Sequence, residues 1–195
     1  WLPRAWHPGY CPASPFKLVT AVAALRANVV ASDEKLTCNG IYKGMECHCY
    51  PGRHGEMDLR SAVAQSCNVY FFQVAERLGQ KLLISEARSF GMNQSPDIPL
   101  PRLRNSPNVP DPDWKKKMVG EQWALEDTFN VAIGQGGLRQ SPLQMACFAA
   151  ALANQNRIFH PKLIKSEPDQ TVKIFSQPIG LSKENMVAII EGMHD

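Results

Sequence analysis

The chain has 195 residues, of which 44% are hydrophobic and 20% are charged, a composition typical of a globular protein with one core. Its formal net charge of +3 excludes the strongly basic character of a nucleic-acid-binding domain, so no nucleic-acid partner is expected. No apolar segment is long enough to cross a bilayer, and the opening residues WLPRAWHPGY lack the charged and apolar regions of a signal peptide.

The first predicted elements are helices separated by one irregular segment. Residues 14–30 (SPFKLVTAVAALRANVV) are rich in Ala, Leu and Val and have a proline in the first turn, which predicts a buried helix. Residues 31–57 contain glycine, proline and cysteine without a clean period, which predicts a loop supported by a metal or a disulfide. Asp58 is a candidate N-cap for the helical run LRSAVAQ, and another helix follows Asn68 and ends at Gly79.

The second half of the chain also has mainly helical signals. Residues 93–122 contain six prolines, which predicts an extended surface segment. Residues 141–153 begin with an N-cap serine, a proline at N1 and a glutamine at N3, which predicts a helix. Residues 157–175 are a candidate hairpin turning at 168–170, and residues 182–192 form a final short helix. The expected fold is therefore mainly α, with one small hairpin.

Ser14 and Lys17 form an S-x-x-K pattern, which places both side chains on one helix face. A serine hydroxyl is a poor nucleophile until a base takes its proton, and a lysine can be that base when burial keeps its amine neutral. The N–H groups at a helix N-terminus also suit a developing oxyanion. However, S-x-x-K is expected by chance about once in a chain of this length, and Ser66-x-Asn68 is equally common. Neither pattern identifies an enzyme by itself.

A group of thiol and imidazole side chains falls within one 30-residue window: Cys38, Cys47, His48, Cys49, His54 and Cys67. A tetrahedral zinc site needs only four such ligands, although the spacing is not that of a standard zinc finger. A disulfide between Cys38 and either Cys47 or Cys49 is the alternative, natural for an oxidising compartment. The residues alone leave both interpretations open.

Three segments carry a family resemblance, in order and with sensible spacing. They are RAWHPGYCPASPFKLVTAVAAL, GRHGEMDLRSAVAQSCNVYFFQVAERLG and VPDPDWKKKMVGEQWALEDTFNVAIGQGGLRQSPLQMA. The first resembles R-A-x4-Y-x-P-G-S-x-x-K, the second G-H-G…A-I-x-x-S-C-D/N-x-Y-F-Y, and the third P-x-x-E-W-K…W-x-x-G-D-T-x-N-x-x-I-G-Q-G…T-P-L-Q. From about Arg4 to Leu163 the chain thus resembles the class B penicillin-binding proteins of the elongation type.

The resemblance implies a peptidoglycan D,D-transpeptidase that cross-links stem peptides in cell-wall elongation and is trapped by β-lactams. It implies that Ser14 attacks the penultimate D-alanine carbonyl and that Lys17 takes the serine proton. It further implies that Ser66 relays a proton to the leaving amine, and that Asn68 holds the substrate amide and Lys17. Membrane proteins of the elongation machinery are the implied partners, at the periplasmic face of the bacterial inner membrane.

The resemblance also implies a structural zinc ion, Zn2+, beside the active site. Its ligands in the family match His54 and Cys67 together with two upstream residues, for which Cys38 and Cys49 are the candidates here. Cys47 or His48 can substitute for one of these two. The four ligand places are then all filled by protein, which is typical of a structural site.

Two departures from the family pattern matter. Ala13 stands where the family has glycine, and no K-T-G or K-S-G occurs in the 195 residues. The resemblance places that motif on a strand beyond the segment matching Asn185–Met193. We therefore expect a single partial domain, residues 1–195, that comprises the helical lobe of the α/β transpeptidase fold and is inactive alone. The alternatives are a β-lactam sensor or β-lactamase of the same fold, and a non-catalytic zinc-stabilised scaffold.

Overall fold

The computed structural model describes the chain apart from residues 1, 97, 102–105, 156, 160 and 164–173. Its helices are a 3-10 turn η1 (Ser14–Phe16), α1 (Lys17–Arg26), α2 (Leu59–Ala64), α3 (Asn68–Ser89), α4 (Pro112–Met118), α5 (Leu125–Ala132), α6 (Pro142–Ala153) and α7 (Lys183–His194). Its strands are β1 (Leu36–Cys38), β2 (Ile41–Tyr42), β3 (Met45–Glu46), β4 (Gly55–Met57), β5 (Arg157–Phe159) and β6 (Ile174–Pro178). The mainly helical prediction is confirmed.

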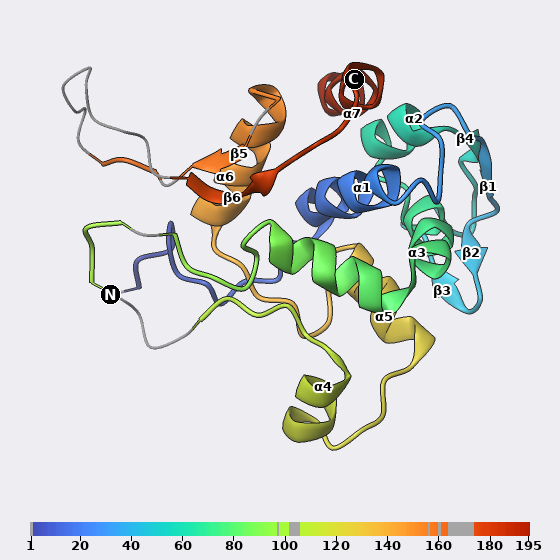
Figure 1. The fold of residues 1–195 in the computed structure, drawn as a ribbon. Helices are drawn as coiled ribbons and strands as arrows, with labels where there is room; N and C mark the ends of the chain where they lie inside the picture. The colour runs from blue at the N-terminus through green and yellow to red at the C-terminus, as the bar shows by residue number, and fades with distance from the viewer. Residues whose placement is uncertain (1, 97, 102–105, 156, 160, 164–173) are drawn as a thin grey trace.

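Helix α1 lies at the centre of the molecule, with α3 on one side and α2 and α7 on the other (Figure 1). Every residue from Val19 to Leu25 is buried, as expected for a helix that is apolar on all faces. The predicted buried helix is therefore real, although it opens as a 3-10 turn and ends at Arg26. Because α1 starts directly after Ser14, the core fixes the position of the candidate nucleophile.

Helices α2 and α3 meet at a tight turn that contains Ser66. Asp58 caps α2 as predicted, since its carboxylate accepts the Ser61 N–H at 2.8 Å. The expected helix end at Gly79 is only partly right: Gly79 leaves the helical region (φ 74°, ψ 156°), but the helix resumes and continues to Ser89. The second part persists because Leu83, Ile84 and Ala87 are buried against the core.

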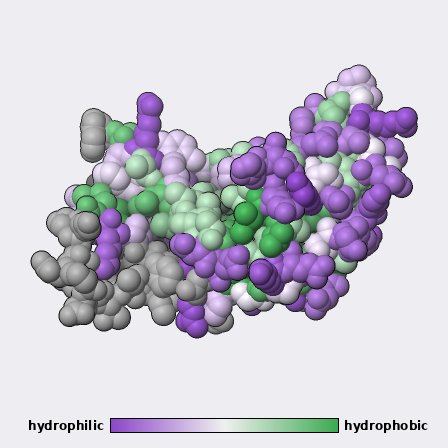
Figure 2. Space-filling view, turned by 90° about the horizontal axis from the view of Figure 1, so that it is seen from above, coloured by the Kyte–Doolittle hydropathy of each residue, from purple (hydrophilic) through white to green (hydrophobic). Residues whose placement is uncertain are grey.

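The segment predicted to be a loop, residues 31–57, instead forms two short antiparallel pairs. Strands β2 and β3 make a hairpin in which Lys43 and Gly44 both have positive φ, the geometry of a two-residue type I′ turn. Strand β1 pairs with β4, and this pairing places Cys38 opposite Gly55. The pairing brings Cys38, at the end of β1, next to His54, which precedes β4. Figure 2 shows that the outer surface over this end of the molecule is mostly hydrophilic, whereas an apolar band crosses the middle of the same face.

The proline-rich segment contains a helix that the sequence reasoning missed. Helix α4 begins at Pro112, because proline is tolerated at N1 and the Asp111 carboxylate accepts the Trp114 N–H at 2.7 Å. Helix α5 was not predicted either. Helix α6 follows the predicted Ser141 cap, α7 forms in the predicted final helical segment with Ser182 as its N-cap, and β5 and β6 form the expected hairpin. Its predicted turn at 168–170 lies outside the described residues. Among the described residues, no helix is long and apolar enough to span a membrane.

Candidate active site and metal centre

The four predicted catalytic residues lie in direct contact. The Lys17 Nζ donates to Asn68 Oδ1 at 2.6 Å, to Ser66 Oγ at 2.9 Å and to the Ser66 carbonyl at 2.6 Å. It also lies 3.4 Å from Ser14 Oγ, and Ser66 Oγ donates to Ser14 Oγ at 2.8 Å. Ser14 is exposed whereas Lys17 is buried. The hydroxyl therefore faces solvent above a buried amine, with a second hydroxyl bridging the two.

The environment of Lys17 favours its neutral form. Burial lowers the pKa of this amine to about 8, although the nearby Cys47 and Cys67 thiols act in the opposite direction. A lysine with a pKa near 8 is unprotonated in a substantial fraction of molecules under mildly alkaline conditions. Such an amine can accept a proton from Ser14, either directly or through Ser66.

Three residues around the serine–lysine pair, Ala13, Gly134 and Ser66, have backbone conformations with positive φ. Ala13 has φ 53° and ψ −146°, and its N–H donates to the Gly134 carbonyl at 2.9 Å. Gly134 itself has φ +77°, and a Cβ there would lie 2.1 Å from the Ala13 carbonyl oxygen. Ser66 also has positive φ, 51°. Gly134 is thus a positioning residue that the sequence reasoning passed over, although it belongs to the I-G-Q-G segment of the resemblance.

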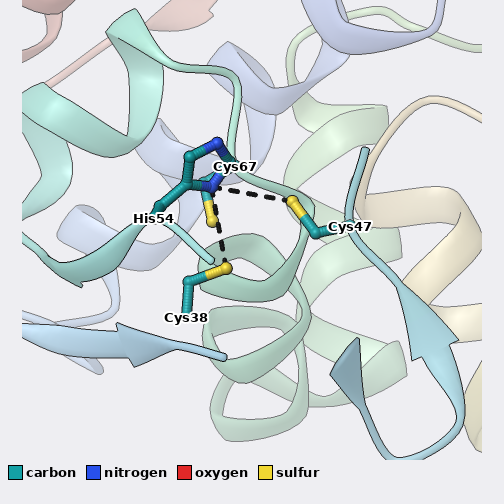
Figure 3. A group of neighbouring side chains, drawn as sticks. All are labelled: Cys38, Cys47, His54 and Cys67. Atoms are coloured by element: carbon teal, nitrogen blue, oxygen red, sulfur yellow. Dashed lines mark hydrogen bonds between the residues drawn. The ribbon is translucent and has the colours of Figure 1, made fainter. Parts of the chain in front are cut away.

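Four side chains from separate parts of the chain converge beside this site (Figure 3). Cys38 ends β1, Cys47 follows β3, His54 precedes β4, and Cys67 is the N-cap of α3. Their ligand atoms all lie within 4.8 Å of one another. The His54 Nδ1 lies 3.6 Å from the Cys38 sulfur and 3.7 Å from the Cys47 sulfur.

The fourth member of this group is Cys47, which the sequence reasoning named as an alternative, in place of Cys49. The hairpin β2–β3 returns the chain so that the Cys47 N–H donates to the Gly40 carbonyl at 2.8 Å, and the Cys47 side chain is buried. Cys49 lies two residues further on and is partly exposed. Burial and the neighbouring Cys47 and Cys38 thiols raise the pKa of Cys49 to about 12. His48 is exposed and is not a member of the group.

The donor set fits zinc. Three thiols and one imidazole are a common structural zinc set, and a tetrahedron with zinc–sulfur bonds of about 2.3 Å separates its ligand atoms by roughly 3.7 Å. The two sulfur–nitrogen distances to His54, 3.6 and 3.7 Å, are close to that spacing. All six cysteines are free thiols, so the predicted alternative of a disulfide is not formed in this structure. Although burial opposes ionisation of Cys47, N–H groups of Cys49, Val69 and Asn68 lower its pKa to about 7.

The cysteine group is attached to the catalytic residues through the backbone. The Asn68 N–H donates to the Cys47 sulfur at 3.3 Å, and the Tyr70 N–H donates to the Cys67 sulfur at 3.4 Å. Cys67 lies between Ser66 and Asn68 in the sequence. The thiols therefore hold the first turn of α3, from which Asn68 reaches Lys17.

Comparison with known proteins agrees with this geometry. A family model described as penicillin binding protein transpeptidase domain matches residues 1–193. The chain belongs to this family. It is 30% identical over 182 residues to the peptidoglycan D,D-transpeptidase MrdA of Haemophilus influenzae, a match that covers 90% of this chain and 28% of that protein. It is 32% identical over 168 residues to MrdA of Escherichia coli K12, covering 84% of this chain and 26% of that protein.

The fold of this penicillin-binding-protein chain also matches solved structures. PBP2 of Pseudomonas aeruginosa in complex with WCK 5153 superposes with a TM-score of 0.84 at 26% identity, covering 98% of this chain and 43% of that chain. PBP2 of Helicobacter pylori superposes with a TM-score of 0.85 at 24% identity, covering 99% of this chain and 36% of that chain, which shows the shared fold. The chain spans about a quarter of the length of the two MrdA relatives.

Proposed function

We propose that this chain supplies the serine–lysine part of the active site of a peptidoglycan D,D-transpeptidase of cell-wall elongation. One observation carries the proposal: the buried Lys17 amine lies within hydrogen-bonding distance of Ser14, Ser66 and Asn68 at once. Family membership and the D,D-transpeptidase activity named for the MrdA relatives support the substrate class, the D-Ala-D-Ala end of a stem peptide.

The geometry supports an acyl-serine mechanism. Neutral Lys17 takes the Ser14 proton, and the Ser14 oxygen attacks the carbonyl carbon of the penultimate D-alanine. We expect the Ser14 N–H, at the start of η1, to donate to the oxygen that becomes negative. The peptide C–N bond then breaks, and the terminal D-alanine leaves with a proton passed from Lys17 through Ser66.

A second stem peptide completes the reaction. Its amine attacks the Ser14 ester carbonyl, the ester C–O bond breaks, and the proton of the amine returns to the Ser14 oxygen through Lys17. A β-lactam carbonyl meets the same serine, and its ring amide opens to leave an acyl-serine. We expect Asn68 to hold the substrate amide through its side-chain N–H2 group, since its Oδ1 already accepts from Lys17.

We propose that Cys38, Cys47, His54 and Cys67 bind one structural zinc ion. When bound, the metal supplies a fixed cross-link between the two strand pairs and the start of α3. The contacts from Asn68 and Tyr70 to two of these sulfurs support a role in holding the catalytic motif rather than in the chemistry. Zinc content per chain, measured by elemental mass spectrometry, tests this: one zinc is expected, and none after all four residues are replaced.

We further propose that the protein works at the periplasmic face of the inner membrane with proteins of the elongation machinery. The support is a pair of structural relatives: PBP2 of H. pylori in a complex with MreC, and a peptidoglycan synthase complex. Co-purification of the natural gene product with an MreC-type protein tests the partner class; a protein recovered without any such partner argues against it.

The activity test measures release of D-alanine and formation of cross-linked peptide by the natural full-length gene product. Ser14→Ala is expected to abolish both. The matched control is Ser85→Ala, which removes an exposed hydroxyl that bonds only locally to the Leu82 carbonyl on α3 and should leave the rate unchanged. Undiminished D-alanine release by Ser14→Ala contradicts the proposal.

A further inference from the structure

Cys49 is a fourth thiol, beside the group formed by Cys38, Cys47, His54 and Cys67. Its sulfur lies 3.8 Å from the Cys38 sulfur, although it is not a member of the four-residue group. Cys38 is 1% exposed, whereas Cys49 is partly exposed. A reagent in solvent therefore reaches Cys49 before it reaches Cys38.

The closeness of these two sulfurs is set by the packing of two turns. Gly40 follows Cys38 by two residues, has φ +87°, and packs so closely that a Cβ there would lie 2.2 Å from the Gly52 carbonyl oxygen. The Cys47 N–H also donates to the Gly40 carbonyl. The loop that carries Cys49 is thus held against the end of β1 by backbone contacts as well as by the thiols.

We infer that Cys49 is a thiol–disulfide exchange site, which forms a disulfide with Cys38 and so withdraws Cys38 from the metal. This inference rests on the proposed zinc site. The oxidant is a small-molecule disulfide: the Cys49 sulfur attacks it, a mixed disulfide forms, and one thiol leaves with the Cys49 proton. The Cys38 sulfur then attacks the Cys49 sulfur and displaces the second thiolate. The two cysteines lose two electrons, which reduce the reagent to its two thiols.

The consequence is a metal site with three protein ligands in place of four. Three-ligand zinc sites are open, and the lost thiolate removes much of the affinity, so the metal leaves. The sulfurs of Cys47 and Cys67, which accept from the N–H groups of Asn68 and Tyr70, are then no longer held together by the metal. Oxidation at Cys49 is in this way coupled to the position of the Ser66–Asn68 motif.

Zinc release from the chain tests the inference. Zinc content is measured first; oxidised glutathione is then added with a chromogenic zinc chelator, and the disulfides are mapped by non-reducing peptide mass spectrometry. Release is followed over hours, because uncatalysed disulfide rearrangement takes minutes to hours. The variants are Cys49→Ser and Cys49→Ala, and the control is Cys147→Ser, which removes a partly exposed thiol on α6.

The expected result, in the unmodified chain and in Cys147→Ser, is zinc release together with a mapped Cys38–Cys49 disulfide. A dithiol reductant should reduce this disulfide. Release is expected to be at least tenfold slower in both Cys49 variants. Equal release rates in those variants, a disulfide between other cysteines, or Cys49 variants that bind no zinc would each overturn the inference. If the chain binds zinc but keeps it in oxidised glutathione and forms no disulfide, the exchange reaction at Cys49 is refuted, whereas the proposed zinc site is not. A chain without zinc before treatment refutes the proposed metal site as well.

Discussion

Replacing Ala13 by glycine is expected to stabilise this chain, although glycine normally weakens a fold. Ala13 has φ 53° and ψ −146°, a region that only glycine enters without strain. Two backbone hydrogen bonds hold it there: its N–H donates to the Gly134 carbonyl and its carbonyl accepts from the Phe16 N–H, both at 2.9 Å. The residue before the candidate nucleophile is therefore strained, and the strain is removable by one substitution.

The magnitude follows from two opposing effects. A residue held in such a region costs about 1–3 kcal/mol, whereas glycine adds freedom to the unfolded chain that costs about 0.4–1 kcal/mol. Ala13→Gly should therefore raise the free energy of unfolding by about 1 kcal/mol. This is a shift in stability alone, because the side chain that is lost is a single methyl group.

Urea denaturation followed by circular dichroism measures this difference. The matched control is Ala150→Gly, the same change at an exposed position of the regular helix α6, which should lower the free energy of unfolding by roughly 0.5–1 kcal/mol. If Ala13→Gly destabilises the chain as much as Ala150→Gly does, then Ala13 carries no strain and the reasoning fails.

Three further predictions concern the two sites. The rate at which a β-lactam acylates the natural gene product should rise as the pH passes through about 8 and then level off. The reason is that burial lowers the pKa of Lys17 to about 8 and the neutral amine is the base. An acylation rate that does not change between about pH 6 and pH 10 contradicts this. In Cys67→Ser the serine oxygen can still accept from the Tyr70 N–H, but the thiolate ligand is lost. Zinc affinity measured by competition with a chelator should therefore fall by more than about 100-fold, which exceeds the loss caused by replacing a residue that only supports a metal ligand. Gly134→Ala should lower the free energy of unfolding by about 2 kcal/mol or more in urea, because its Cβ meets the Ala13 carbonyl oxygen at 2.1 Å; an unchanged midpoint contradicts that packing.

The elements that were predicted from sequence are those whose signals are local. Asp58, Ser141 and Ser182 each accept an N–H in the first turn of the helix they precede, and this chemistry is visible in a few adjacent residues. Helix α4 was missed because its first residue, Pro112, was counted among loop-forming prolines, whereas proline at N1 is compatible with a helix.

The candidate site was predictable in its members but not in its contacts. The choice between Cys47 and Cys49 depends on how the chain returns after the hairpin β2–β3, which buries Cys47 and leaves Cys49 partly exposed. No local sequence pattern fixes that return. The contact between Ala13 and Gly134 joins residues 121 positions apart, so only the folded chain reveals it. The convergence of Ser14 and Lys17 with Ser66 and Asn68 was expected through family resemblance, and helix geometry alone supplied only the first pair.

The central claim is that Ser14 is the residue that becomes acylated, and peptide mapping tests it most directly. The natural gene product is incubated with penicillin G, digested, and searched by mass spectrometry for the peptide that carries the drug. We expect one adduct per chain, on the peptide containing Ser14, which disappears in Ser14→Ala and persists in Ser85→Ala. An adduct on any other residue, or a protein that remains unmodified, would contradict it.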